Sequence, residues 1–212
     1  MNQLQQDAPI RISRRRVLGL SAVGAGLGYL GYRIWSLPGG FRINTVEKPT
    51  PAVDPAAFRL VVDGAVERPA TFTLDEFQAL PSVKQISDFH CVEGWGVDNV
   101  RWEGVRFQTL AEMVGAKKDA TFVTFYSEGD VYKDSLSISQ AMLPDVILAY
   151  SMWEKPLEQK HGYPLRLIMP RMYGYKGPKW LKRVEFVSYR VTGYWEQRGW
   201  QIDAWIDRGS GQ

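Results

Sequence analysis

The sequence has few of the residues that most often carry redox or cross-linking chemistry: its 212 residues include one cysteine, Cys91, and two histidines. A single cysteine cannot form an internal disulfide, and it cannot complete the CxxCH motif that attaches a c-type haem. GxGxxG and P-loop patterns are missing, and the composition indicates no coiled coil, disorder or repeats. The chain is therefore expected to be an ordinary globular protein without a disulfide framework, an attached haem or a familiar nucleotide-binding loop.

An excess of positive charge is also missing from most of the chain. The formal net charge is +3, but residues 1–40 alone carry +4, which leaves −1 for the remaining residues. A nucleic-acid-binding domain normally carries a basic patch or stripe. We therefore expect no nucleic-acid partner.

A hydrophobic run long enough to span a membrane with ease is likewise missing. The uncharged run Val17–Tyr32 has 16 residues, whereas a spanning helix needs about 20. The segment Ser13–Leu18, with three adjacent arginines before the run, is typical of a secretory signal and resembles a twin-arginine signal. The alternative is a weak transmembrane or interfacial helix that extends to Leu37, and a retained anchor stays open because no clear cleavage site follows.

The rest of the chain predicts one α+β domain. Residues 1–40 are expected to be the signal or anchor, 41–57 a proline-rich linker or extended segment, and 58–212 the folded domain. Many short strands and a few short helices without regular βα alternation favour α+β. Strands are expected over 58–62, 84–92, 102–105, 121–127, 131–138, 146–150, 165–169 and 184–191, and helices over 74–80 and 107–114.

Local signals mark the ends of the predicted helices. Thr73 and Glu76 match a capping box for the first helix, and Gly115 is a plausible C-cap for the second. Ser139 can cap a short helix that ends at Met142.

The lone cysteine lies where a predicted strand ends. Gly94 and Gly96 permit a sharp turn directly after Cys91. An exported protein keeps structural cysteines in pairs, so an unpaired one is either sequestered or used. Packing as a small buried hydrophobe is the alternative interpretation.

A second segment combines glycines with basic residues. The stretch from His161 to Trp180 contains Arg166, Lys176 and Lys179. Backbone N–H groups in such a loop can form an anion-binding nest, and these cations can bind a phosphate. A solvated basic loop is the alternative interpretation.

Three motifs in matching order resemble those of the sulfite oxidase family. Phe89–Trp95 is similar to the segment with the molybdenum ligand, and His161–Arg166 and Gly174–Trp180 are similar to the molybdopterin-binding segments. Gly193–Trp200 resembles the C-terminal signature. The resemblance covers about residues 58–205 and is closest to the small exported members, among which are periplasmic methionine sulfoxide reductases.

The resemblance implies a sulfite-oxidase-like molybdopterin-binding fold and an oxidoreductase whose cofactor is molybdopterin with molybdenum. Cys91 would ligate the metal through its thiolate, which suits a soft site. Cys91, Glu93 and Tyr132 are the implied catalytic residues. The residues implied to contact the cofactor are Asn44, His90, Cys91, Ser127, His161, Arg166, Lys176, Gly177, Pro178 and Lys179.

One departure bears on the substrate. Sulfite-oxidising members of the family place an arginine five residues after the ligand cysteine, where this chain has Gly96. Glu93 instead brings a carboxylate, which repels an anionic substrate and could relay protons, or could only bond the local turn. Tyr132, Trp95 and Trp195 are candidates for the pocket wall, or for the core. The pattern favours a neutral S- or N-oxide over sulfite.

We therefore expect an exported enzyme that transfers an oxygen atom to or from a small S- or N-oxide. Electrons would be exchanged with an external carrier, a membrane haem b protein or a cytochrome c, in the periplasm or another extracytoplasmic compartment. Export of the folded protein by the twin-arginine route is expected, with a membrane tether through the leader as an option. Three alternatives stay open: oxidation of sulfite, a thiol hydrolase that pairs Cys91 with His161 as base, and a cofactor-free binding protein.

Overall fold

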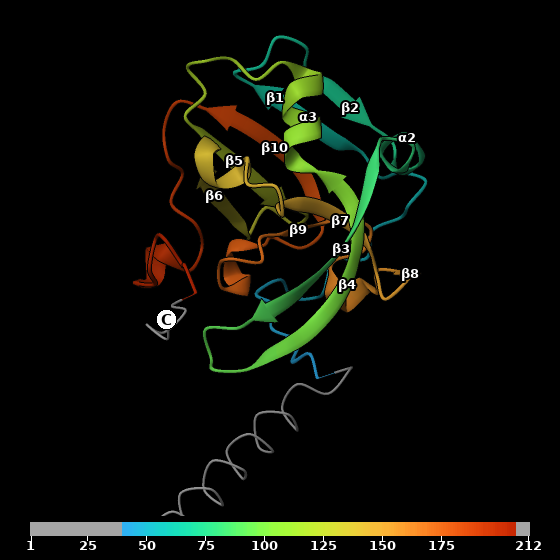
Figure 1. Ribbon diagram of the computed structural model, residues 1–212, viewed down its shortest axis with the longest axis vertical. Coiled ribbons are helices and arrows are strands. Elements are labelled where there is room, and N and C mark those ends of the chain that lie inside the picture. The colour runs from blue at the N-terminus through green and yellow to red at the C-terminus, as the bar shows by residue number, and fades with distance from the viewer. Residues whose placement is uncertain (1–39, 207–212) are drawn as a thin grey trace, which may run out of the picture.

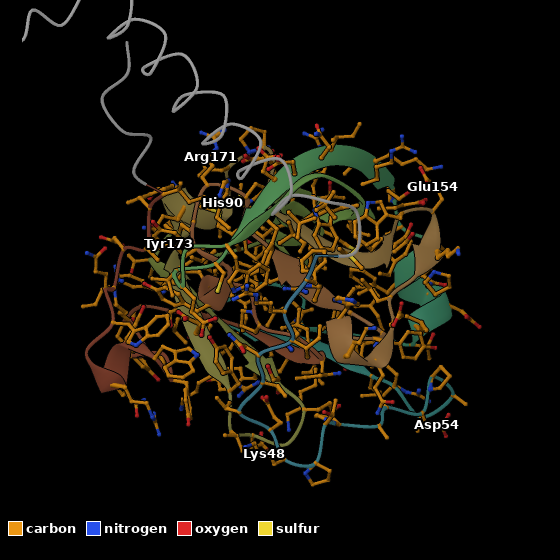
Figure 2. All side chains as sticks on the ribbon, turned by 90° about the horizontal axis from the view of Figure 1, so that it is seen from below. Lys48, Asp54, His90, Glu154, Arg171 and Tyr173 are labelled. Carbon is orange, nitrogen blue, oxygen red and sulfur yellow. The ribbon has the colours of Figure 1, made fainter. Side chains whose placement is uncertain are left out.

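The computed structural model describes residues 40–206. The signal or anchor expected over residues 1–40 therefore lies outside the described residues, Gly40 excepted. In the described range no helix is long and apolar enough to cross a membrane. Residues 41–57 contain neither helix nor strand, and Figure 2 shows this coil running across one face of the domain to Lys48 at its edge.

Five strands form the first sheet, in the order β2-β1-β10-β5-β6 (Figure 1). They are β1 (Leu60–Gly64), β2 (Ala70–Phe72), β5 (Phe122–Ser127), β6 (Lys133–Ser137) and β10 (Leu181–Val187). The β1–β10 pair is parallel and the other pairs are antiparallel. Leu60, Val62 and Val184 are fully buried, as expected for strands that cover a core.

The second sheet has the order β3-β4-β7-β8, with β9 also paired to β7. Its strands are β3 (Ser82–His90), β4 (Gly96–Arg106), β7 (Ile147–Met152), β8 (Lys155–Pro156) and β9 (Arg166–Ile168). The short strand predicted over 102–105 is wrong in extent. Pairing of Val97 with Phe89 and of Gly96 with His90 extends β4 to eleven residues, which the glycines had concealed.

Within residues 40–206 there are three short α-helices: α2 (Leu74–Gln78), α3 (Phe107–Val114) and α4 (Ile138–Ala141). The capping box of Thr73 and Glu76 is confirmed, as is the left-handed C-cap at Gly115. The cap predicted for α4 is wrong by two residues. Ser137, rather than Ser139, accepts the hydrogen bond from the Gln140 N–H.

Apolar side chains from both sheets and from α3 form the main core. Phe107, Phe125 and Phe186 are almost fully buried, and burial of each such side chain stabilises the fold by about 2 kcal/mol. A second cluster around Trp102 supports the β3–β4 hairpin. The α+β prediction is confirmed.

In the described part of the chain, three 3₁₀ segments lie in the loops: η1 (Gln159–His161), η2 (Gly174–Lys176) and η3 (Glu196–Arg198). Loops that adjoin these segments meet the β3–β4 turn and the coil at residues 41–47 around a single cavity. This convergence places the motifs singled out in the sequence around one site.

Candidate functional site

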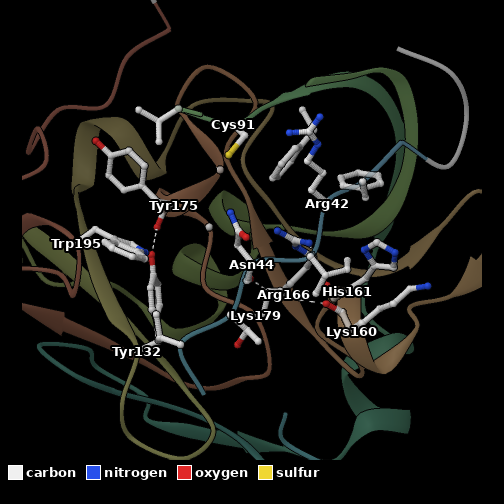
Figure 3. Close-up of a pocket in the computed structure, with 18 of the residues that line it drawn as sticks. Arg42, Asn44, Cys91, Tyr132, Lys160, His161, Arg166, Tyr175, Lys179 and Trp195 are labelled. Atoms are coloured by element: carbon white, nitrogen blue, oxygen red, sulfur yellow. Dashed lines mark hydrogen bonds between the residues drawn. The ribbon is translucent and has the colours of Figure 1, made fainter. Parts of the chain in front are cut away.

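The lone cysteine lies in the turn that joins β3 to β4. The Cys91 N–H donates to the Trp95 carbonyl (2.8 Å), and the Gly94 N–H donates to the Cys91 carbonyl (3.1 Å). Gly94 has a φ of 82°, a left-handed conformation that glycine adopts without steric cost. The turn thereby presents the half-buried side chain of Cys91 to a cavity of about 290 Å³ (Figure 3).

Glu93 reaches the same cavity from the same turn. Its Oε2 accepts hydrogen bonds from Trp95 Nε1 (3.2 Å) and from the Cys91 thiol (3.9 Å). Hydrogen bonds from Trp95 and Asn44 hold the pKa of Glu93 below its usual value, whereas burial raises the pKa of the Cys91 thiol. In cofactor-free protein at neutral pH the carboxylate is ionised and the thiol is protonated, which makes Cys91 a poor nucleophile by itself.

Position 96 has no room for a side chain. A Cβ atom at Gly96 would lie 2.9 Å from the Phe89 carbonyl oxygen, so an arginine there would displace the hairpin backbone. A guanidinium nevertheless reaches the site, because Arg42 lines the cavity and acts electrostatically on both Cys91 and Glu93. The charge beside Cys91 is therefore mixed, where the sequence indicated only the Glu93 carboxylate in the turn after it.

Arg166, on β9, is a buried cation that faces the cavity. It is 4% exposed, and its Nη1 donates to the His161 carbonyl (3.0 Å). The rings of Phe89 and Trp102 each lie 5.6 Å from its guanidinium carbon. Within residues 40–206 its Nε is buried without a hydrogen-bond partner, and burial lowers the pKa of Arg166 to about 10. A bound anion would satisfy this group.

Lys179 supplies a second cation. Its Nζ donates to the carbonyls of Asn44 (2.8 Å) and Lys160 (3.3 Å), which orient the ammonium without neutralising it (Figure 3). Burial, followed by the charge of Arg166, lowers the pKa of Lys179 to about 7. The same two causes lower the pKa of His161 to about 4, so His161 is neutral at physiological pH. The two cations suit a phosphate group.

Cofactor-free protein is expected to gain stability with rising pH through Lys179. Its pKa of about 7 in the folded state lies below the ordinary value of 10.5. Between these values the unfolded chain binds a proton that the folded chain does not, so the free energy of unfolding rises with pH. Urea unfolding at about pH 6.5 and about pH 9.5 measures the slope.

Lys179→Met should remove that part of the slope. Lys160→Met is the matched control, because Lys160 is an exposed lysine paired with Glu158 at the rim of the same cavity. Equal slopes in wild type and Lys179→Met would contradict the assignment.

Ser127, Tyr132 and Gly177 contribute further atoms to the wall. Ser127 ends β5 fully buried, and in the described chain its Oγ has no hydrogen-bond partner. The Tyr132 hydroxyl donates to the Tyr175 carbonyl (2.5 Å), which fixes its ring at the wall (Figure 3). Gly177 lines the cavity, and a side chain there would displace the backbone of β9, because a Cβ atom would lie 2.6 Å from the Leu167 carbonyl oxygen.

Three predicted cofactor-binding residues do not line the cavity. His90 ends β3 and lies against a separate small void. The Pro178 carbonyl accepts the Leu167 N–H (3.0 Å), so Pro178 holds the loop to β9 instead. The prediction for Lys176 needs correction, because its ammonium is buried behind the wall between Asp134 and Glu196.

The sequence interpretation missed several residues of the wall. They are Phe41, Arg42, Lys160, Tyr175 and Trp200. Phe41 and Arg42 belong to the coil interpreted as a linker, where no strand or helix pattern indicated a contact. Trp200 and Tyr175 stand inside or beside quoted motifs, and the high aromatic content was the signal that could have indicated them.

Comparison with known proteins gives a consistent result. The family model described as the oxidoreductase molybdopterin binding domain matches residues 47–195. The putative protein-methionine-sulfoxide reductase subunit YedZ1 of Azospira oryzae is 39% identical over 148 residues, covering 70% of this chain and 56% of that protein. The mitochondrial sulfite oxidase of Drosophila melanogaster is 29% identical over 179 residues, covering 72% of this chain and 31% of that protein. The match thus spans about half, or less, of these relatives.

A solved structure shares the fold. The sulfane dehydrogenase SoxCD of Paracoccus pantotrophus superposes with a TM-score of 0.62 at 22% sequence identity. The superposition covers 67% of this chain and 41% of that one. The predicted fold class, mixed short strands with a few short helices in a sulfite-oxidase-like arrangement, is confirmed.

Proposed function

Because the chain belongs to the oxidoreductase molybdopterin-binding domain family, we propose that it transfers an oxygen atom to or from a small, neutral S- or N-oxide at the cavity beside Cys91. The protein is an oxidoreductase of the sulfite oxidase type, and its cofactor is molybdopterin with molybdenum. The proposal depends mainly on one observation: the thiol of Cys91 shares one cavity with two cations, the buried Arg166 and the half-buried Lys179.

The residues around the cavity fit this cofactor. The buried Nε of Arg166 and Oγ of Ser127 lack partners within residues 40–206, and a phosphate-bearing pterin would supply acceptors for both. Lys179 adds charge, and Gly177 lines the same cavity without a side chain. When bound, the molybdenum cofactor supplies two-electron oxygen-atom transfer, with Cys91 as its proposed protein ligand.

Glu93 is the proposed proton-handling group. Conversion of a sulfoxide to a thioether consumes two protons and two electrons and releases water, so protons must reach the substrate oxygen. Because Glu93 is ionised at neutral pH, it would relay protons from solvent, accepting each one before passing it on. Glu93 lies beside Cys91 at the mouth of the cavity, in contact with the indole N–H of Trp95. Tyr132 is held by the Tyr175 carbonyl, and we assign it to orienting the substrate.

The charges around the mouth support a neutral substrate over sulfite. Glu93 is ionised and repels an anion, and Gly96 leaves no place for the arginine of sulfite-oxidising relatives. Arg42 partly offsets Glu93, which keeps sulfite oxidation as the second candidate. A hydrolase that uses Cys91 with His161 is not favoured, because the thiol donates to Glu93 and its pKa is raised.

Export and electron transfer belong to the same proposal. The adjacent arginines before Val17 support export by the twin-arginine route to the periplasm or an equivalent compartment, with the leader as signal or anchor. Residues 58–212, with the wall segment 41–47, would form the catalytic domain. A membrane haem b protein or a cytochrome c would be the electron partner, since the chain carries no CxxCH motif of its own.

The proposal is tested on protein made in a host that synthesises the cofactor. We expect about one molybdenum per chain and a higher kcat/KM for a neutral alkyl sulfoxide than for sulfite, measured with artificial electron carriers. Protein without stoichiometric molybdenum, or with sulfite as the clearly preferred substrate, would overturn it.

Glu93→Gln is expected to shift the ratio of the two kcat/KM values toward sulfite: removal of the charge alone contributes up to about fivefold, and loss of the proton relay lowers sulfoxide turnover further. Unit charges about 4 Å apart in water interact by about 1 kcal/mol, which sets this limit for an exposed carboxylate. Glu154→Gln is the control, because it removes an exposed carboxylate paired with Arg101 outside the cavity. An unchanged ratio in Glu93→Gln would show that Glu93 does not determine the preference for a neutral substrate over sulfite.

A further inference from the structure

Lys176 is buried behind the cavity wall, at 1% exposure. Its Nζ donates to Asp134 Oδ1 and Glu196 Oε1, each at 2.5 Å, and to the Ser135 carbonyl at 3.0 Å. Both carboxylate side chains are also 1% exposed. A lysine ammonium has three protons, and these contacts use all of them, so none remains for a ligand in the cavity.

The three charged residues come from three separate segments of the cavity wall. Asp134 lies on β6, Lys176 ends η2 and Glu196 begins η3. A residue that lines the cavity is close to each of them in sequence: Tyr132 to Asp134, Tyr175 to Lys176 and Trp195 to Glu196. One buried cation thus joins the three segments that carry the aromatic side of the wall.

The segment around η3 contacts this cluster directly. Glu196 Oε2 accepts the Gly193 N–H (2.9 Å), and a Cβ atom at Gly193 would lie 2.7 Å from Asp134 Oδ2. The segment therefore sits directly on Asp134. Trp195 and Trp200 follow as a pair with ring centroids 4.7 Å apart, and both line the cavity.

We propose that Lys176, with Asp134 and Glu196, is the positioning group for the aromatic wall formed by Trp195 and Trp200, and that it sets how tightly the enzyme holds its substrate. The assignment of this wall to substrate rests on the proposed function. The position of the wall itself is measurable without turnover. A cluster that only stabilises the fold would change stability and leave the wall where it is.

The cluster contains two carboxylates and one ammonium, so its net charge changes when Asp134 gains or loses a proton. We therefore expect its hold on the aromatic wall to depend on pH. Asp134 is faced by Lys176 and Tyr175 from η2, by Glu196 from η3 and by Tyr132, which directly precedes β6. Burial, opposed by Lys176, raises the pKa of Asp134 to about 7. In the described chain its Oδ2 has no hydrogen-bond partner.

The raised pKa of Asp134 determines whether stability rises or falls with pH. The folded-state pKa of Asp134 exceeds the ordinary value of 3.8, so the folded protein loses stability as pH rises between these values. Above about pH 7 the cluster carries one surplus negative charge. The wall is therefore expected to be held better below pH 7 than above it.

The test uses full-length holoenzyme labelled with 5-fluorotryptophan. The chain has eight tryptophans, and Trp195→Phe assigns the Trp195 resonance in the ¹⁹F NMR spectrum. Lys176→Met should shift or broaden that resonance and raise KM for a neutral alkyl sulfoxide between about 10-fold and 100-fold, with a smaller change in kcat and unchanged molybdenum content. Lys182→Met is the control, because it breaks a surface pair with Asp130.

A second variant covers the case in which Lys176→Met does not fold. Asp134→Asn leaves Lys176 paired with Glu196 and removes the surplus charge. The Trp195 resonance of the wild type should move between about pH 6 and about pH 8.5, and that of Asp134→Asn should stay constant.

Three results would overturn the proposal, and a fourth would overturn only the proposed function. An unchanged Trp195 resonance and KM in Lys176→Met, a wild-type titration in Asp134→Asn, or molybdenum loss with an unmoved Trp195 would each overturn the proposal. If the resonances behave as expected and the wild type turns over no sulfoxide, the proposed function fails and the positioning role stands.

Discussion

A Cys91→Ser variant is expected to lose more than about 100-fold of its turnover while its fold is retained. Removal of groups that only support a metal ligand typically costs about 10-fold to 100-fold, so loss of the ligand itself should exceed that range. Cys91 is half-buried and lies in an exposed turn, and its thiol donates one long hydrogen bond, to Glu93. Serine fills nearly the same space, and the melting temperature of cofactor-free protein should therefore stay close to that of wild type.

Three measurements separate a ligand from a packing residue. Steady-state rates, molybdenum per chain and thermal unfolding are compared for wild type and Cys91→Ser. Full activity in the variant would end the proposed role of the thiolate. Thiol-dependent hydrolysis by metal-free wild type, abolished in Cys91→Ser, would favour the hydrolase instead.

Replacement of Arg166 by methionine is expected to have opposite effects on cofactor retention and on stability. Most of the bound molybdenum should be lost, because the buried guanidinium that faces the cavity is absent. Cofactor-free Arg166→Met should be as stable as wild type, or more stable by up to about 2 kcal/mol. Replacing a buried ion pair by apolar side chains is often neutral or stabilising by about 1–4 kcal/mol, and the buried guanidinium of Arg166 carries the same kind of desolvation cost. Loss of the bond to the His161 carbonyl costs about 1 kcal/mol.

The measurement is urea unfolding of cofactor-free protein together with molybdenum content of protein from a cofactor-competent host. Arg101→Met is the matched control, because Arg101 is an exposed arginine paired with Glu154 on the same sheet. A large loss of stability in cofactor-free Arg166→Met would show that the guanidinium serves the fold. Retention of molybdenum would show that the cofactor does not need it.

Short-range features of this protein were predictable because they depend on adjacent residues. The capping box of Thr73 and Glu76 forms within one helical turn, and the glycines after Cys91 form a turn within five residues. Gly115 ends α3 in the left-handed region because it has no Cβ atom. The family motifs are also local in sequence, and they brought Cys91 and Arg166 to one cavity as expected.

Long-range partners were not predictable from the same patterns. Lys176 has the same sequence surroundings as Lys179, three residues later, yet one is enclosed by carboxylates and the other faces the cavity. The partners of Lys176 lie 42 and 20 residues away along the chain. Arg42 was missed for the same reason, since only the path of the coil over the domain brings it to Cys91.

The Cys91 turn combines features that adjacent residues determine with features that depend on distant segments of the chain. The sequence by itself determined the α+β class, the family and the presence of Glu93 without an arginine at Gly96. Only the tertiary structure decided that Gly96 has no space for a side chain, that Arg42 stands beside Glu93, and that Lys176 is enclosed by Asp134 and Glu196 behind the wall. The physical reason is that a charged side chain enters a protein interior only where it finds a partner, and that partner is set by packing between distant segments.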